Sequence, residues 1–260
     1  MPKSRKTDKY RLIEKRGLDR FEEYKPWLKV HEFGSCGRVH RIVGWKNKRI
    51  HQLMSDLELY YFVLTQWDDD VVDIREQYPL LPLEETISIA DEVGVNHPPM
   101  NSNKKTVMTT DFLITRKIDN KLIEFARAIK TQADIEKTRT VKKLLIEKRY
   151  WERTGIDWGV VTENYIPKTK AINIYSIYND YFWDEDSEYT KDEIELFTDK
   201  FKIALLKNNY NVINTINDFE INTNVRNGEG LKLLKHLLAI KKIKTNMDIK
   251  FNFTTMKIWF

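Results

Sequence analysis

The chain has 260 residues, of which 41% are hydrophobic and 32% charged. This composition is typical of one large or two ordinary globular domains and excludes a disordered or fibrous protein. No run approaches the roughly 18 consecutive apolar residues of a membrane span, and the first residues lack the apolar segment of a secretory signal. We therefore expect a cytoplasmic protein with no membrane contact, and its single cysteine, Cys36, excludes an internal disulfide and a cysteine zinc site.

The formal net charge of +5 is distributed unevenly along the chain. Residues 1–50 contain 15 Lys and Arg against 6 Asp and Glu, whereas the other 210 residues contain 29 against 33. A basic leading segment ahead of a slightly acidic body is typical of contact with a polyanion, and nucleic acid is the first candidate. Charge alone leaves open the alternative of a solvated, lysine-rich tail.

The first clear element is a helix over residues 56–66. Ahead of it, to about Gly44, periodicity is weak and predicts a basic arm with irregular structure. Ser55 followed three residues later by Glu58 has the pattern of a capping box, and apolar residues then recur at helical spacing.

The segment after this helix predicts a small sheet. A strand is expected over 71–78, followed by a loop over 84–105, and an antiparallel hairpin is expected from strands 110–115 and 122–130 around a turn at 116–121. A long helix over 133–153 and a strand over 158–162 follow. The order helix, three strands, helix, strand predicts an α/β domain over residues 1–166, with a mixed sheet flanked by helices.

From Pro167 onward the composition shifts toward Asn, Ile and Lys. A second capping box at Thr190 predicts a helix to about Lys207, a further helix is expected over 231–243, and residues 249–260 alternate like a terminal strand or β-ribbon. These elements predict a small helical, winged-helix-like domain over 167–260. Its 14 Lys and Arg almost balance its 13 Asp and Glu, which favours a protein-contact module over a strong DNA binder.

The predicted hairpin suggests a chemical site. A turn centred near residues 118–119 would set Asp111 opposite a residue near Arg127, give or take one, with Lys130 at the same end of the hairpin. Glu58 of the preceding helix could reach that end. Two carboxylates can hold Mg²⁺, and a lysine beside them can orient or deprotonate water and offset phosphate charge, which is the chemistry of phosphodiester hydrolysis.

Each of these residues also has an ordinary structural interpretation. Glu58 is the glutamate of a capping box, Asp111 could begin a strand or a turn, and Lys130 could be a solvated strand-end lysine. No histidine pair has metal-ligand spacing. The sequence contains no phosphate-binding loop of the GxxxxGK[ST] type, so ATP use by this chain is not expected.

Several blocks of the first domain resemble the TnsA family, the endonuclease subunits of heteromeric cut-and-paste transposases, including CRISPR-associated ones. The similarity covers roughly residues 24–163, and the blocks occur in matching order. They are GRVHRI at 37–42, RIH at 49–51 with SDLEL at 55–59, DIREQYPLLP at 73–82, MTTDFL at 108–113 and KRYW at 148–151.

The resemblance implies a restriction-endonuclease-like PD-(D/E)XK core. It implies catalytic roles for Glu58, Asp111 and Lys130, with Mg²⁺, for which Mn²⁺ may substitute, held by the two carboxylates and the backbone carbonyl of Ile129. It further implies cleavage of the 5′ side of transposon-end DNA, a partner DDE-type transposase that cuts and joins the 3′ side, and an AAA+ regulator that contacts the C-terminal domain.

The chain departs from the family pattern at Ala128, where the motif has Glu or Gln two residues before the lysine. A methyl group neither ligates metal nor orients water. Either the site works with two carboxylates and a carbonyl, or cleavage is impaired and the chain is a DNA-binding and assembly subunit. A stand-alone nuclease, which would cut without partners, is a third interpretation. Under the nuclease interpretation we expect Ala128→Glu to preserve or raise nicking.

We expect basic side chains of the leading segment and of the loop before Asp111 to bind the DNA backbone without reading its sequence. No segment resembles a recognition helix, so sequence specificity is expected from the partner. The predicted phosphate ligands are Arg5, Lys6, Lys9, Arg11, Lys15, Arg16, Arg38, Arg41, Lys46, Lys48, Arg49, Lys104 and Lys105.

Overall fold

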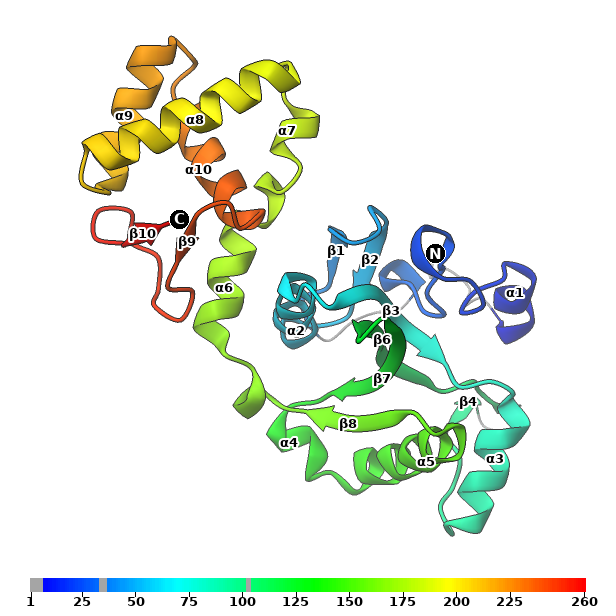
Figure 1. Ribbon diagram of the computed structural model, residues 1–260. Coiled ribbons are helices and arrows are strands. Elements are labelled where there is room, and N and C mark those ends of the chain that lie inside the picture. The colour runs from blue at the N-terminus through cyan, green and yellow to red at the C-terminus, as the bar shows by residue number, and fades with distance from the viewer. Residues whose placement is uncertain (1–6, 33–36, 102–103) are drawn as a thin grey trace. The chain divides into compact units, whose positions relative to one another are not determined.

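A computed structural model describes residues 7–32, 37–101 and 104–260, without the side chains of 99–101 and 104. The chain divides into two compact units, residues 1–166 and 167–260, and the division falls at Pro167, where the composition changes. Figure 1 shows that the first unit contains the main sheet and that the second is largely helical. Within the described residues, no helix is both long and apolar enough to cross a membrane.

The first unit is built on a four-stranded mixed sheet, as predicted. Its strands are β3 (Val71–Pro79), β6 (Thr109–Ile118), β7 (Lys121–Ile129) and β8 (Asp157–Val161), and they lie in the order β3-β6-β7-β8. β3, β6 and β7 pair antiparallel, whereas β8 runs parallel to β7. The parallel pair follows from the helical crossover between β7 and β8.

The hairpin of β6 and β7 is longer than the sequence predicted. Ile118 pairs with Lys121, so Asp119 and Asn120 alone form the turn, with φ of 49° and 62°. A two-residue turn with both residues left-handed matches the twist of the strands, and Asp and Asn tolerate that conformation. The turn predicted over 116–121 was therefore too wide.

Two helices of this unit frame the sheet. α2 (Asp56–Trp67) begins at Ser55, whose hydroxyl accepts a hydrogen bond from the third helical residue, and α5 (Thr138–Thr154) ends at Gly155, whose φ is 70°. The helix predicted over 133–153 is divided, because Lys137 has extended backbone between α4 (Gln132–Ile135) and α5.

α5 and α3 (Leu83–Glu92) pack on the sheet through one apolar core. That core consists of Leu80, Ile89, Ala90, Met108, Leu113, Ala126, Ile146, Tyr150 and Trp151.

Two features of the first unit were missed from the sequence. β1 (His40–Val43) and β2 (Ile50–Leu53) form a hairpin where irregular structure was expected. α3 lies inside the predicted loop 84–105, because buried Ile89 and Ala90 secure it to the core. The remaining short elements are α1 (Asp8–Ile13), β4 (Pro99–Asn101), β5 (Lys104–Lys105) and 3-10 turns at Phe21–Glu23, Val30–Glu32 and Glu163–Tyr165.

The second unit is helical with a small two-stranded ribbon. Its elements are α6 (Lys168–Ile177), a 3-10 turn at Tyr178–Asp180, α7 (Trp183–Asp186), α8 (Lys191–Lys207), α9 (Val212–Thr223), α10 (Glu229–Ala239), β9 (Lys244–Thr245) and β10 (Ile258–Trp259). The capping box at Thr190 is confirmed. Of the terminal strand or β-ribbon predicted over 249–260, the structure has only β10, which forms an antiparallel ribbon with β9. Before β10, the side chain of Asn252 accepts the backbone N–H of Thr254 and turns the chain.

Candidate active site

The hairpin register places the first predicted site residue. Phe112 pairs with Arg127, so Asp111 lies across from Ala128, within the one residue that the sequence allowed. Asp111 is near the start of β6, and Lys130 follows directly after the end of β7. Because the strands are antiparallel, these two positions meet at one end of the hairpin.

Asp111 and Lys130 are in direct contact. One carboxylate oxygen of Asp111, Oδ2, accepts hydrogen bonds from the backbone N–H of Ile129 at 2.7 Å and from the Lys130 ammonium at 2.5 Å. The same ammonium donates to the carbonyl of Ile129 at 3.0 Å. The structure therefore brings together the carboxylate, the lysine and the carbonyl that the resemblance assigned to one site.

Glu58 enters the site from the first turn of α2. Its backbone N–H donates to the Ser55 hydroxyl at 3.1 Å, which fixes the helix start. Its carboxylate accepts the backbone N–H of Met54 at 2.9 Å, and the side chain is buried with 6% exposure. Ser55 therefore caps the helix, but the Glu58 carboxylate accepts from the backbone of Met54, one residue before the cap, and not from the backbone N–H of Ser55 as in a capping box. The same carboxylate is within electrostatic reach of Asp111, and its catalytic role remains a prediction.

The electrostatics of the site are those of two carboxylates sharing one lysine. Burial and the charge of Asp111 raise the pKa of Glu58 to about 8. Burial disfavours the charge on Lys130, but Asp111 and Glu147 outweigh it and raise the pKa of Lys130 above its usual range. At neutral pH Lys130 is therefore charged, and Glu58 retains its proton unless a further cation enters.

The donor set fits a magnesium ion that keeps part of its water. Among the described residues, no three His, Cys, Asp or Glu side chains gather as a metal cluster. Mg²⁺ commonly takes one or two carboxylates and completes its shell with water and substrate phosphates. Glu58, Asp111 and the Ile129 carbonyl offer hard oxygen donors of that kind, and the raised pKa of Glu58 marks a place where a divalent cation would be favourable.

A third acid at this site was missed from the sequence. Glu147 of α5 is 4% exposed and accepts hydrogen bonds from the Thr110 hydroxyl at 2.8 Å and the Trp158 indole at 3.0 Å. Burial and the charge of Asp111 raise its pKa to about 7. A signal was present: Glu147 is three residues after Leu144 and four before Trp151, on the buried face of the helix.

Ala128 lies where α5 covers the sheet. It is fully buried and, by strand alternation, shares a face of β7 with Ala126, which packs with Ile146 and Trp151 of α5. A small side chain there permits close approach of the helix that carries Glu147. The helix that covers Ala128 therefore also carries Glu147, an acid within electrostatic reach of Asp111.

Gln77 is a second residue that the sequence analysis did not single out. It is buried in β3 with φ of 49°, a left-handed conformation that is uncommon for a residue with a side chain. Its amide nitrogen donates to Glu58 at 3.4 Å, and its amide oxygen accepts from the Thr109 hydroxyl at 3.4 Å. Gln77 therefore links Glu58 to β6, the strand that bears Asp111.

Three of the predicted phosphate ligands are instead buried in ion pairs, which corrects that prediction. Arg16 is fully buried and pairs with Glu14 and Glu32, and Arg11 pairs with Asp8. These ion pairs hold the basic leading segment together, and the two arginine side chains are buried instead of exposed to solvent. The physical reason is that acidic residues of the same segment are close enough in the fold to neutralise them.

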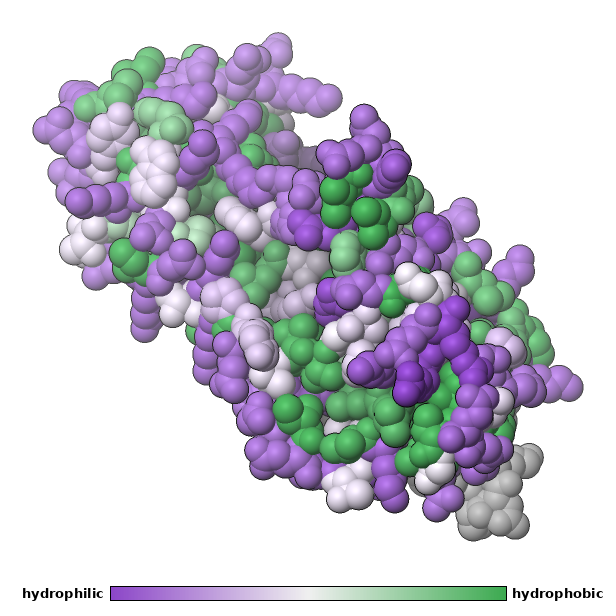
Figure 2. Space-filling model, turned by 60° about the horizontal axis from the view of Figure 1, so that its bottom comes forward, coloured by the Kyte–Doolittle hydropathy of each residue, from purple (hydrophilic) through white to green (hydrophobic). Residues whose placement is uncertain are grey.

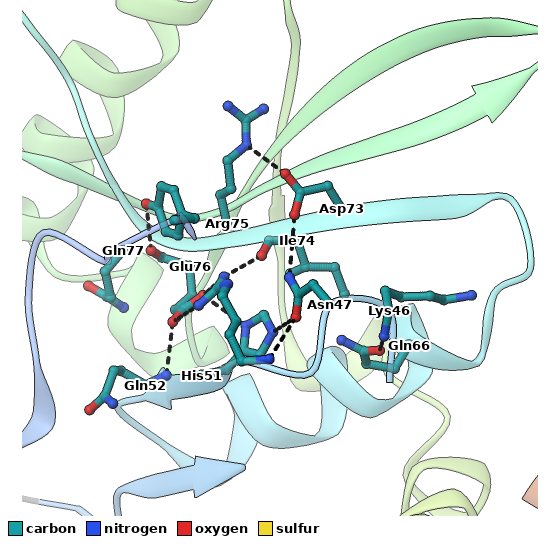
Figure 3. Close-up of polar contacts among 12 residues, drawn as sticks. Lys46, Asn47, His51, Gln52, Gln66, Asp73, Ile74, Arg75, Glu76 and Gln77 are labelled. Carbon is teal, nitrogen blue, oxygen red and sulfur yellow. Dashed lines mark hydrogen bonds and ion pairs between the residues drawn. The ribbon is translucent and has the colours of Figure 1, made fainter. Parts of the chain in front are cut away.

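Arg49 is the third buried cation. It donates to Glu76 of β3 at 2.9 Å and to the carbonyl of Ile74 at 2.6 Å. Figure 3 shows Glu76 on the side of β3 that faces His51 and Gln52, and both of these also contact its carboxylate. These charged contacts hold the pKa of Glu76 well below its usual range despite burial. This network fixes the β2 segment to β3.

The other predicted phosphate ligands have different positions. The structure leaves Lys9, Lys15, Arg38, Arg41, Lys48 and Lys105 exposed and Lys46 half-buried, and it does not describe the side chain of Lys104. Arg5, Lys6 and Cys36 lie outside the described residues. The exposed side chains remain predictions as DNA contacts.

Paired carboxylates beside a lysine, on a mixed sheet flanked by helices, are the arrangement expected of an endonuclease. Comparison with known proteins identifies the family. A family described as "TnsA-like endonuclease N terminal" matches residues 68–163, and one described as "TnsA endonuclease C terminal" matches residues 166–247. The chain is 36% identical over 242 residues to the transposon Tn7 transposition protein TnsA of Escherichia coli, covering 93% of this chain and 84% of that protein.

The chain therefore belongs to the TnsA family, the endonuclease subunits of Tn7-like transposases. The two matched families meet near residue 166, close to the division between the two structural units. A nuclease activity and a role in a transposase complex with DNA follow from that membership.

Proposed function

We propose that this chain is a Mg²⁺-dependent DNA endonuclease that cuts the 5′ side of transposon ends. The observation that carries the proposal is the cluster of Asp111, Lys130 and the Ile129 carbonyl beside the buried Glu58. Glu58, Asp111 and the carbonyl would hold the metal. When bound, the metal supplies charge neutralisation at the phosphodiester and lowers the pKa of water.

The side chains perform the rest of the chemistry. Lys130 is charged and placed beside Asp111, so it can offset the negative charge that develops on the phosphoryl oxygens. Glu58 would release its proton when the metal binds, because the cation favours the charged carboxylate. Glu147 contacts Thr110, next to Asp111, and acts as a positioning residue that also sets the local charge.

We propose further that the chain acts with a partner DDE-type transposase, which processes the other strand, and with an AAA+ regulator that contacts the second unit. The near balance of charge in residues 167–260 supports a protein-contact role for that unit. The exposed apolar side chains Leu196, Ile203 and Ile221 of α8 and α9 support it as well.

A second candidate function is that of an assembly subunit with impaired cleavage, and Ala128 is the observation that favours it. The position of Glu147 weighs against it, because the site still contains a third carboxylate close to Asp111. Only a cleavage measurement separates the two.

The deciding experiment is a strand-resolved cleavage assay on a transposon-end duplex, with and without the partner transposase, in Mg²⁺, Mn²⁺ and chelator. We expect 5′-strand cleavage that needs partner and metal. Asp111→Ala should reduce it by at least about 100-fold while leaving assembly on DNA intact. Cleavage by that variant at the wild-type rate would refute the site. Assembly without any cutting by the wild-type chain would establish the second function.

A further inference from the structure

A pocket of about 390 Å³ lies between the start of α5 and residues 96–98 of the segment after α3. Arg139, Lys142 and Lys143 of α5 line it on one side. Lys142 and Lys143 follow Arg139 by three and four positions, so both are neighbours of Arg139 on the surface of the helix. Figure 2 shows that the side of the first unit carrying α5 has hydrophilic side chains with hydrophobic ones between them.

The opposite wall of the pocket is held rigidly. His97 is buried and makes hydrogen-bond contacts with the Thr86 hydroxyl of α3 at 2.9 Å and with the carbonyl of Pro98 at 3.1 Å. Burial lowers the pKa of His97, so this residue is a neutral part of the wall at pH 7. The pocket is therefore a fixed recess with its positive charge on the helix side.

The three cations of this pocket differ from the other basic residues of α5. Lys148 and Arg149 pair with Glu152, and Arg153 pairs with Glu85 and Glu92. In the part of the chain that the structure describes, no carboxylate lies within ion-pair distance of the three pocket cations. Of the acids nearest along the chain, Glu136 is exposed, Asp134 pairs with Lys137, and Glu147 accepts hydrogen bonds from Thr110 and Trp158.

Lys143 is the pocket cation nearest the candidate active site, because it precedes Glu147 by one turn of α5. Desolvation and the charges of Arg139 and Lys130 hold the pKa of Lys143 below its usual range, so Lys143 is within electrostatic reach of the active-site lysine. The amino end of α5 adds favourable backbone polarity, since its N-cap residue, Lys137, supplies no side-chain cap. The pocket is thus a place of uncompensated positive charge beside the nuclease site.

We propose that this pocket binds backbone phosphates of duplex DNA next to the scissile bond. The inference rests on the proposed function and names a phosphate-binding site for it on α5, away from the basic leading segment. Arg139 and Lys142 contact phosphate oxygens, and Lys143 adds charge between them and Lys130. The contacts are to the backbone, so they are independent of base sequence.

The test compares two double variants of the full chain. Arg139→Gln/Lys142→Gln removes two pocket charges, and Lys148→Gln/Arg149→Gln removes two charges of the same helix that Glu152 neutralises. Binding of a labelled 30-base-pair duplex of arbitrary sequence is measured against salt concentration. We expect the pocket variant to bind more weakly and the slope of log affinity against log salt to fall by about 2. The control variant should bind as the wild type does.

Thermal unfolding of all proteins checks that each variant is folded, and 5′-strand cleavage with the partner transposase is measured in parallel. Wild-type cleavage with unchanged DNA binding by the pocket variant would overturn the pocket and leave the nuclease function standing. Equal losses in both double variants, or no duplex binding by the wild type at low salt, would also overturn the pocket. Weakened binding by the pocket variant without cleavage by any protein would keep the pocket and refute the nuclease.

Discussion

Glu58 belongs both to the start of α2 and to the candidate metal site, and its protonation state affects the stability of the fold. The carboxylate is buried beside Asp111, and its pKa is raised to about 8, so that the folded protein binds a proton which the unfolded chain releases near its ordinary pKa. A folded-state pKa above the unfolded value makes stability fall as pH rises between the two values. A bound divalent cation favours the charged carboxylate and should reverse that loss.

This argument predicts how stability depends on pH and metal. Without metal, we expect the melting temperature to fall from pH 7 to pH 8.5, a window above the lowered pKa values of His51 and His97. Glu58→Gln should flatten this slope, because a neutral side chain has no proton to lose. Mg²⁺ should raise the melting temperature more at pH 8 than at pH 6 in the wild type, and much less in the variant.

Scanning calorimetry over pH, with Mg²⁺ or chelator, measures these effects. Asp68→Asn, a change of a half-buried acid that pairs with Arg116 in the same unit, serves as the control and should keep the wild-type slope. An identical slope in Glu58→Gln and the wild type would contradict the raised pKa.

Ala128 and Glu147 form the second prediction at the residue scale. Because Ala128 is fully buried under α5, Ala128→Glu would place another carboxylate among Glu147 and Asp111. We expect this variant to lose about 2 kcal/mol of stability and to cut poorly, whereas the motif alone predicts preserved or raised nicking. Glu147→Gln by itself should lower cleavage by about 10- to 100-fold.

Combining the two substitutions tests whether they share one role. Ala128→Glu/Glu147→Gln moves the acid from helix to strand and should recover part of the stability and cleavage lost by Ala128→Glu. Chemical unfolding and the strand-resolved assay give the double-mutant cycle. Strictly additive losses would show that the two positions act independently.

At the scale of elements, the first turn of α2 supports the candidate site directly. Ser55 accepts the backbone N–H of Glu58 and its hydroxyl lies 3.4 Å from the Glu58 carboxylate, so one cap fixes both the helix and the acid. Ser55→Ala should therefore cost about 1 kcal/mol of unfolding free energy and also reduce cleavage.

Thr190→Ala is the matched control for the cap. Thr190 closes the capping box of α8 in the second unit, so we expect a similar loss of stability with unchanged cleavage chemistry in the assembled reaction. Chemical denaturation and 5′-strand cleavage give the two measurements. The prediction fails if both caps affect cleavage equally.

Most elements of the sheet could be predicted because their signals are local. Alternation in β3, the helical spacing of α2 and the apolar face of α5 are visible in the sequence. The length of the hairpin turn could not be predicted, because Asp119 and Asn120 adopt left-handed conformations that depend on the pairing of the two strands. α3 was missed because its stability comes from burial against α5 and not from its own pattern.

At the scale of the molecule, the site lies wholly in the first unit. Glu58, Asp111, Lys130 and Glu147 all precede Pro167, and the main sheet and its core belong to residues 1–166. We expect a fragment of residues 1–166 to unfold cooperatively by circular dichroism. We also expect it to keep the pH dependence attributed to Glu58, with partner-dependent cleavage lost. Failure of this fragment to fold would show that the second unit is needed for the first.

The sequence alone determined the order of the sheet elements, the boundary in composition at Pro167 and the resemblance through which Glu58, Asp111 and Lys130 were assigned. These depend on local periodicity and on residue identity. The tertiary structure decided which cations form ion pairs. Arg11, Arg16 and Arg49 are paired inside the fold, whereas Arg139, Lys142 and Lys143 line a pocket and have no carboxylate within ion-pair distance among the described residues. The tertiary structure also brought Glu147 to the site. Which charges meet depends on contacts between segments far apart in the chain, and only folding brings those together.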